Sequence, residues 1–278
     1  MEWFIGLAGS VAIAGAAYAK RSLSGTGFLA AVALGTCMYS LGSAIWFGSL
    51  IAFFISSTLW SKWKKRAKET AESAYEKSGR RDAGQVFANG GLGLLLCAAH
   101  WAWPHPLWWY AFLGVMASVT ADTWATEIGG LSRTPPRSIK TGRRVPPGTS
   151  GGVSGLGLAA SLAGGLFIGA AAWTLLTAIP GQAAPDAVAA PVRLIAWVGV
   201  AGLAGIIGSL TDSWIGAAWQ QMYRCAECGR EIEQVRHCDK PAVRIRGRAG
   251  WNNDVVNVAG SLAGGLFAAS LAFVFGLA

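Results

Sequence analysis

Apolar residues fill long stretches of this chain, and charged residues gather in the short segments between them. A membrane-spanning helix requires about 20 mostly apolar residues. By this criterion the pattern predicts an all-α protein, a polytopic membrane helix bundle with about eight spans in a single integral membrane domain, 1–278. The predicted spans lie near 3–19, 25–41, 43–60, 84–101, 106–130, 151–178, 191–222 and 254–277.

The distribution of basic residues favours eight spans over seven. Residues 25–60 form one apolar stretch, which we divide at 41–43, where small residues allow a turn. With this division every Lys and Arg except Arg193 falls on one side of the membrane. The positive-inside rule makes that side cytoplasmic and places both termini outside. We therefore expect a multi-pass protein of the cell membrane with cytoplasmic basic loops at 61–82, 132–148 and 223–250.

Composition excludes an ordinary soluble domain. Charged residues make up 13% of the chain and the net charge is +9, whereas soluble domains carry about 25% charged residues. Residues 61–82 mix bases and acids with good helix formers, so we expect a cytoplasmic helix there. The simpler alternative is a topology determinant that meets anionic membrane lipids.

Two sequence patterns occur twice, in the same order. "TADTWA" at 120–125 returns as "LTDSWIG" at 210–216, and "ASLAGGLFIG" at 160–169 returns as "GSLAGGLFAA" at 260–269. A basic segment separates the two patterns in each copy, so the sequence predicts a parallel internal repeat. Small residues allow close helix packing, but packing does not explain the repeated Asp-x-Trp. The sequence does not show whether the two Asp-x-Trp copies form one site or two.

Four acids lie in the cytoplasmic half of predicted spans: Asp122, Glu127, Asp212 and Asp254. A charge at the centre of a span costs a few kcal/mol, which makes such acids functional candidates. The alternative is a structural acid paired with a loop arginine. We predict Asp122 and Asp212 as Mg²⁺ ligands, with Glu127 and Asp254 as further catalytic candidates.

Basic and small polar residues precede three of the predicted spans that leave the cytoplasmic side. Helix N-termini offer free N–H groups to anions, arginines pair with phosphate, and Mg²⁺ bridges phosphates. These features together predict a phosphate- or nucleotide-binding site. Its candidate residues are Arg80, Arg81, Asn89, Arg143, Arg144, Gly148, Thr149, Ser150, Gly151, Gly152, Arg248, Asn253 and Asn257.

A second candidate metal site lies in the last basic loop. Cys225, Cys228, His237 and Cys238 offer four soft ligands in a pattern that suits a tetrahedral structural zinc. Adjacent His and Cys residues are awkward ligands for one ion, so free thiols or redox-labile cysteines are the alternative.

Five motifs carry a resemblance to a known family: "RRDAGQVFANGG", "ADTWATEIG", "VPPGTSGGVS", "YRCAECG" and "WNNDVVN". From Lys20 onward the chain resembles the plant phytyl-phosphate kinases and their bacterial, archaeal and animal relatives, including transmembrane protein 19. The resemblance implies an integral membrane kinase that converts an isoprenyl monophosphate, such as phytyl or geranylgeranyl phosphate, to the diphosphate. Kinases usually use ATP, but the related phytol kinases favour CTP. The resemblance therefore implies either nucleotide as the donor.

The same residues are compatible with other functions. Parallel repeats, intramembrane acids and a basic vestibule also suit a transporter or flippase of phosphorylated lipid or another anion, and a scaffold without activity is the third alternative. As partners we expect an isoprenyl phosphate lipid, a nucleoside triphosphate and membrane lipids, and no nucleic acid. The sequence leaves the oligomeric state open.

Overall fold

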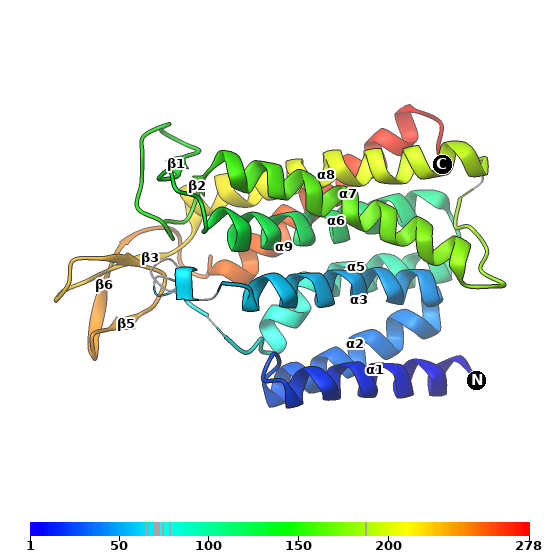
Figure 1. Ribbon diagram of the computed structural model, residues 1–278, viewed down its shortest axis with the longest axis horizontal. Coiled ribbons are helices and arrows are strands. Elements are labelled where there is room, and N and C mark those ends of the chain that lie inside the picture. The colour runs from blue at the N-terminus through cyan, green and yellow to red at the C-terminus, as the bar shows by residue number, and fades with distance from the viewer. Residues whose placement is uncertain (65, 69–72, 74, 78, 187) are drawn as a thin grey trace.

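The fold was obtained as a computed structural model, which describes residues 1–278 apart from 65, 69–72, 74, 78 and 187. Within the described residues, eight helices of 18 or more residues form a bundle (Figure 1). Each of the eight predicted spans overlaps one of them along most of its length. They are α1 (Glu2–Ala19), α2 (Gly25–Gly42), α3 (Ala44–Lys62), α5 (Ala83–Ala102), α6 (Pro106–Gly129), α7 (Gly155–Ala178), α8 (Ala190–Trp219) and α9 (Asn253–Val274).

Six of these helices, α1, α2, α3, α7, α8 and α9, are long and apolar enough to cross a membrane. The chain is thus a polytopic helical membrane protein, while the count of eight spans stays a prediction. α6 is less apolar than the six, and its residues from Trp109 to Ala121 are almost all buried. It packs against α3, α5, α7, α8 and α9, so most of its surface meets protein.

Small residues bring the last four helices into close contact, as the repeated small-residue pattern predicts. A Cβ atom added at Gly165 of α7 would lie 2.5 Å from the carbonyl oxygen of Ala201 in α8. A Cβ atom at Gly260 of α9 would lie 2.9 Å from the Cβ of Asp212 in α8. Glycine at these positions therefore lets the helices that carry the acids pack side by side.

Two small β-sheets correct the all-α prediction. β1 (Arg137–Ser138) pairs with β2 (Gly152–Val153). The other sheet has the order β4-β3-β6-β5 and contains β3 (Met222–Cys225), β4 (Glu231–Ile232), β5 (Arg236–His237) and β6 (Lys240–Arg246). These polar segments lie outside the helices, where hydrogen bonds between strands satisfy their backbone groups.

The strands and caps also shorten two of the predicted spans. α7 begins at Gly155 rather than 151, because the Ser154 hydroxyl caps it by accepting from the Gly157 N–H at 3.1 Å. α8 ends at Trp219 rather than 222, where the chain turns into β3. The helix predicted over 61–82 falls partly on residues outside the described part, and α3 ends at Lys62.

The basic loops and both sheets lie at one end of the bundle, and both termini lie at the other (Figure 1). Arg193, the one basic residue predicted on the opposite side, has a local partner: its Nε donates to Asp186 at 2.8 Å. Asp186 also accepts hydrogen bonds from Tyr110 and Trp197. This buried ion pair fixes the start of α8. Which side of the membrane each end faces remains a prediction.

A polar pocket as the candidate active site

A polar pocket of about 380 Å³ lies at the end of the bundle that carries the sheets. Its walls come from α3, α5, α6, α7, α8, α9 and the loop before α7. Twelve of the residues predicted for the site line it. They are Arg81, Asn89, Asp122, Glu127, Gly148, Thr149, Ser150, Gly151, Gly152, Asp212, Asn253 and Asn257. Both Asp-x-Trp copies therefore contribute to a single pocket.

Asp122 of α6 and Asp212 of α8 lie deep in the helical part of this pocket. The Ser209 hydroxyl donates to Asp122 Oδ1 at 3.5 Å, and Ser209 precedes Asp212 by three residues, which puts both on one face of α8. Asp212 Oδ2 is buried without a hydrogen-bond partner among the described atoms. Neither carboxylate forms an ion pair within the described residues. Two acids thus share a polar cavity, and neither contacts a basic side chain of the described residues.

Glu127, one and a half turns further along α6, has a different environment. It forms an ion pair with Lys68, whose side chain is only 2% exposed, and it accepts a hydrogen bond from Ser61 at 2.5 Å. Lys68 also donates to the carbonyl oxygens of Trp60 and Ser61 near the end of α3. Glu127 is therefore paired, as the structural alternative predicts for such an acid, but its partner is a lysine and not the expected loop arginine. Sequence reasoning missed Lys68, which is one of many bases in the 61–82 segment.

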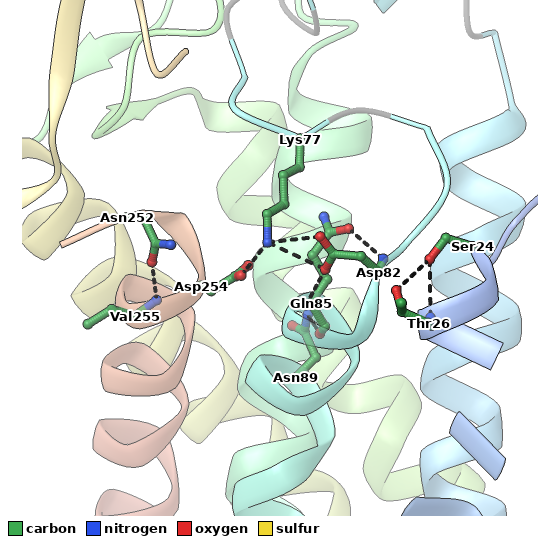
Figure 2. A network of polar contacts seen from close by, with 10 residues as sticks. Ser24, Thr26, Lys77, Asp82, Gln85, Asn89, Asn252, Asp254 and Val255 are labelled. Carbon is green, nitrogen blue, oxygen red and sulfur yellow. Dashed lines mark hydrogen bonds and ion pairs between the residues drawn. The ribbon is translucent and has the colours of Figure 1, made fainter. Parts of the chain in front are cut away.

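Asp254 is likewise paired. Lys77 Nζ lies 2.5 Å from Asp254 Oδ2 and 3.1 Å from Asp82 Oδ2, so it joins the starts of α9 and α5 (Figure 2). Asp82 is also the N-cap of α5, in a capping box with Gln85 (Figure 2). Asp254 does not line the pocket itself, although Lys77 does. Lys77 thus forms part of the pocket wall and ties two helix starts together.

The glycine-rich loop before α7 forms another wall. Gly148 and Gly151 have φ values of 85° and 81°, a conformation that other residues rarely adopt. A Cβ atom at Gly151 would lie 2.8 Å from the carbonyl oxygen of Ser213, next to Asp212. The Ser150 hydroxyl donates to Gln220 at 2.5 Å, which joins the loop to the end of α8. Glycine thus lets this loop approach the acid-bearing helix.

Of the five predicted arginines, only Arg81 lines the pocket. Its guanidinium donates to the Thr58 hydroxyl at 3.2 Å. Arg80, Arg143 and Arg144 are exposed outside the pocket. The exposed Arg248 lies over the Trp219 ring, 5.0 Å from its centroid. The predicted phosphate clamp by these four residues has no support in their positions, because none of them lines the pocket.

The four-stranded sheet supplies residues that sequence reasoning missed. Glu233 lines the pocket, and burial raises the pKa of its carboxyl from 4.5 to about 7. Arg246 of β6 donates to the carbonyl oxygens of Gly216 and Ala217, at 3.2 and 3.0 Å, near the end of α8. No periodicity or motif marks these residues as neighbours of the acids. The predicted zinc ligands lie in this sheet, outside the pocket lining.

A second, apolar cavity of about 60 Å³ adjoins the polar pocket. It is lined mainly by apolar residues of α1, α2, α3 and α5, including Leu34 and Phe54. Arg81, Gln85 and Asn89 line both spaces. A polar boundary of three residues therefore separates a hydrophilic pocket from an apolar space inside the bundle.

Comparison with known proteins places the chain among membrane proteins. The model of the integral membrane protein DUF92 family matches residues 8–265. Protein PGR of Arabidopsis thaliana is 28% identical over 75% of this chain and 75% of its own length. Protein VTE6, chloroplastic, from the same plant is 28% identical over 85% of this chain and 61% of its own length.

An uncharacterized membrane protein of Methanocaldococcus jannaschii is 30% identical over 62% of this chain and 64% of its own length. No solved structure matches the chain. Because the family model covers almost the whole sequence, the assignment does not depend on one motif or one loop. The chain belongs to the DUF92 family of integral membrane proteins.

Proposed function

We propose that this protein is an integral membrane kinase that transfers a phosphoryl group from CTP or ATP to an isoprenyl monophosphate, giving the diphosphate. The observation that carries the proposal is the pair of uncompensated carboxylates, Asp122 and Asp212, in a polar pocket at the end of a membrane helix bundle. The family membership and the motifs that resemble phytyl-phosphate kinases support it.

The two carboxylates fit a magnesium ion. Asp212 Oδ2 has no partner among the described atoms, and Asp122 has only one long hydrogen bond, from Ser209. Two ionised carboxylates without a cation are unfavourable in a low-dielectric site, and hard oxygen ligands are those that Mg²⁺ prefers. When bound there, the ion supplies positive charge to the phosphates of the donor. Asp122 and Asp212 would hold it.

The glycine-rich loop supplies groups suited to the donor phosphates. Residues 148–152 line the pocket beside α8, and the start of α7 follows directly after Ser154. The Thr149 hydroxyl and backbone N–H groups of this loop other than those of Thr149 and Gly152, which donate within the loop, offer hydrogen bonds to phosphate oxygens. Phosphoryl transfer depends mainly on such positioning and charge stabilisation.

The apolar cavity supports a lipid as the acceptor. A phosphate group at the boundary formed by Arg81, Gln85 and Asn89 would leave its hydrocarbon chain beside the apolar space of α1, α2, α3 and α5. Arg81 is the residue at this boundary that pairs with a phosphate.

The reaction needs no side chain as a general base. The acceptor is a phosphate monoester, which is largely ionised near neutral pH because its second pKa is about 6. One of its oxygens attacks the γ-phosphorus of the donor while the bond between that phosphorus and the β–γ bridging oxygen breaks. The products are the isoprenyl diphosphate and the nucleoside diphosphate. The chain has to hold both substrates and balance their charge.

The test uses the purified full-length protein with Mg²⁺, labelled ATP or CTP, and phytyl or geranylgeranyl phosphate. We expect labelled lipid diphosphate from the native protein and from Glu2→Gln, a control that removes an exposed acid at the far end of the bundle. Asp122→Asn should abolish the product while the protein remains folded. Absence of transfer with both donors and both lipids would contradict the proposal, and movement of the lipid phosphate across vesicles without nucleotide would favour a carrier.

A further inference from the structure

The last loop of the chain gathers four metal-ligand side chains at one point. Cys225, Cys228, His237 and Cys238 bring one sulfur or ring-nitrogen atom each to within 4.8 Å of one another. We refer to them as the Cys/His cluster. It lies in the four-stranded sheet and contributes no residue to the lining of the polar pocket.

The backbone explains how the first two ligands converge. β3 ends at Cys225, whose carbonyl oxygen accepts from the Gly229 N–H at 3.0 Å, and whose N–H donates to the Arg230 carbonyl at 3.0 Å. Gly229 has a φ of 70°, so the chain folds back directly after Cys228. This tight turn points both thiols of the Cys-x2-Cys unit to one side, as in zinc knuckles.

The turn between β5 and β6 explains how the adjacent residues His237 and Cys238 can both be ligands of one ion. β5 and β6 are joined by a two-residue turn, Cys238–Asp239, in which both residues have positive φ values of 50° and 58°. Such values are typical of type I′ hairpin turns, and they are uncommon for residues other than glycine. The turn brings the Cys238 sulfur to 3.2 Å from His237 Nδ1, so that neighbouring residues present their ligand atoms together.

The spacing of the ligand atoms matches a tetrahedral site. His237 Nδ1 lies 3.5 Å from the Cys228 sulfur and 3.2 Å from the Cys238 sulfur. Zinc bonds of about 2.0–2.3 Å to nitrogen and sulfur give tetrahedral edges of roughly 3.5–3.8 Å. These two distances are close to tetrahedral edges, and the ligand atoms that lie up to 4.8 Å apart would move closer around an ion.

We propose that the Cys/His cluster binds a zinc ion with a structural role. Three thiolates and one imidazole fill all four positions of a tetrahedral ion, which leaves none for a substrate. The ion would link the turn after β3 to the β5–β6 turn, two segments of the sheet that contain few apolar residues. Buried apolar side chains beside the cluster are few: Cys225 and Ile232 form the small core of this sheet.

The sheet contacts residues beside the polar pocket, so an ion in the Cys/His cluster would also stabilise that side of the pocket. The segment between Cys228 and His237 contacts the residues before Lys77, which holds Asp254. A zinc ion would fix both ends of this segment. The contacts are Arg230 to the Ser73 hydroxyl at 3.3 Å, Gln234 to the Tyr75 carbonyl at 2.8 Å, and the Glu76 N–H to Glu233 at 3.1 Å.

The first test measures metal in the full-length protein, purified in detergent without chelator. We expect one zinc ion per chain by elemental analysis, and we expect Co²⁺ exchange to produce the visible absorption of tetrahedral cobalt with thiolate ligands. Cys228→Ser and Cys238→Ser should lose the zinc. Cys37→Ser, which removes a thiol of α2 outside the cluster, should retain it. Zinc-free native protein, or zinc retained in the double variant Cys228→Ser/Cys238→Ser, would overturn the proposal.

A second test needs no variant and therefore does not depend on whether the variants fold. Cys228 and Cys238 are exposed, so a maleimide reagent would label them quickly if they were free thiols. Zinc binding predicts slow labelling of both residues, becoming fast when a zinc chelator is added. Fast labelling before the chelator, or a disulfide between the two residues, would overturn the proposal. Neither test measures phosphoryl transfer, so the result is independent of the proposed kinase activity.

Discussion

The intramembrane acids divide into two groups with opposite environments. Glu127 and Asp254, nearer the helix ends, each have a lysine partner. Asp122 and Asp212, deeper between α6 and α8, have none among the described residues. The sequence placed all four at similar depth and predicted a catalytic role for each, with Asp122 and Asp212 as the metal ligands. The difference teaches that position along a span does not by itself mark an acid as functional.

The two groups also have different consequences for the fold. A buried pair holds its elements together, and removal of one partner leaves an uncompensated charge. Lys68 joins the segment after α3 to α6, and Lys77 joins the starts of α5 and α9. Asp122 and Asp212 contact no basic side chain in the described part of the chain, so their charges are available to an ion and its ligand. Substitutions at Lys68 and Asp212 test these two roles, and substitutions at Glu233 and Gly151 test the surroundings of Asp212.

The largest effect is expected from Lys68→Met. It leaves the Glu127 carboxylate without its partner, and loss of one member of a buried pair costs about 3–5 kcal/mol. The free energy of unfolding, measured by SDS titration in mixed micelles, should fall by that amount. The double variant Lys68→Met/Glu127→Gln should recover most of the loss, because the uncompensated charge is gone. Equal stability of Lys68→Met and the native protein would show that the pair does not hold α6 in place.

Asp212→Asn should affect activity and not stability. Loss of an electrostatic group that acts on the transition state reduces kcat by about 100-fold or more. The amide keeps the shape of the side chain and removes an uncompensated charge, so the unfolding free energy without Mg²⁺ should stay constant or rise. Phosphoryl transfer and SDS titration on the same preparation check both parts. If the unfolding free energy falls together with kcat, Asp212 has a structural role like that of Glu127 and Asp254.

Glu233 provides a test by pH. Burial raises its pKa from 4.5 to about 7, so between these values the folded chain binds more protons than the unfolded chain. Stability from this group is complete below pH 4.5 and is lost as the pH rises to 7. Glu233→Gln keeps an acceptor for the Glu76 N–H and carries no charge. Above this range it should therefore be more stable than the native protein, by at most about 3 kcal/mol.

The comparison for Glu233 is Glu231→Gln, which removes an exposed acid of the same sheet. Unfolding of both variants and the native protein is followed in detergent from pH 4 to about 8, the range over which a buried carboxyl titrates. If the two variants have the same dependence on pH as the native protein, Glu233 is not protonated in the folded state.

The smallest effect is expected at Gly151. Alanine there would bring a methyl group against Ser213 of α8, in addition to a φ of 81° that disfavours side chains. Overpacking of this kind costs about 1–3 kcal/mol, and it displaces the loop from Asp212. Gly142→Ala is a matched control in the same loop, with a φ of 69° and no atom within 4 Å of the added Cβ. The KM for nucleotide should rise for Gly151→Ala only. Equal effects of both substitutions would show that backbone strain, and not the contact with α8, is responsible.

Several features of this protein follow from the sequence alone. The segments that form the helices are visible because the energy of apolar surface in a membrane depends on composition over about 20 residues, which is a local property. The gathering of Lys and Arg in three loops, the repeated Asp-x-Trp, and the Cys-x2-Cys and His-Cys ligand pattern are local too. Asp122 and Asp212 were identified in this way, as were the glycines of residues 148–152.

Only the tertiary structure decided which charges have partners. Lys68 meets Glu127 across 59 residues of sequence, and Lys77 meets Asp254 across 177. The structure also excluded four of the five predicted arginines from the pocket and introduced Glu233 from a sheet that the apolar pattern does not predict. The physical reason is that a charge is stabilised by whatever lies within a few ångströms in space. Which groups come that close depends on how the helices pack and where the loops turn. A local stretch of sequence does not show this.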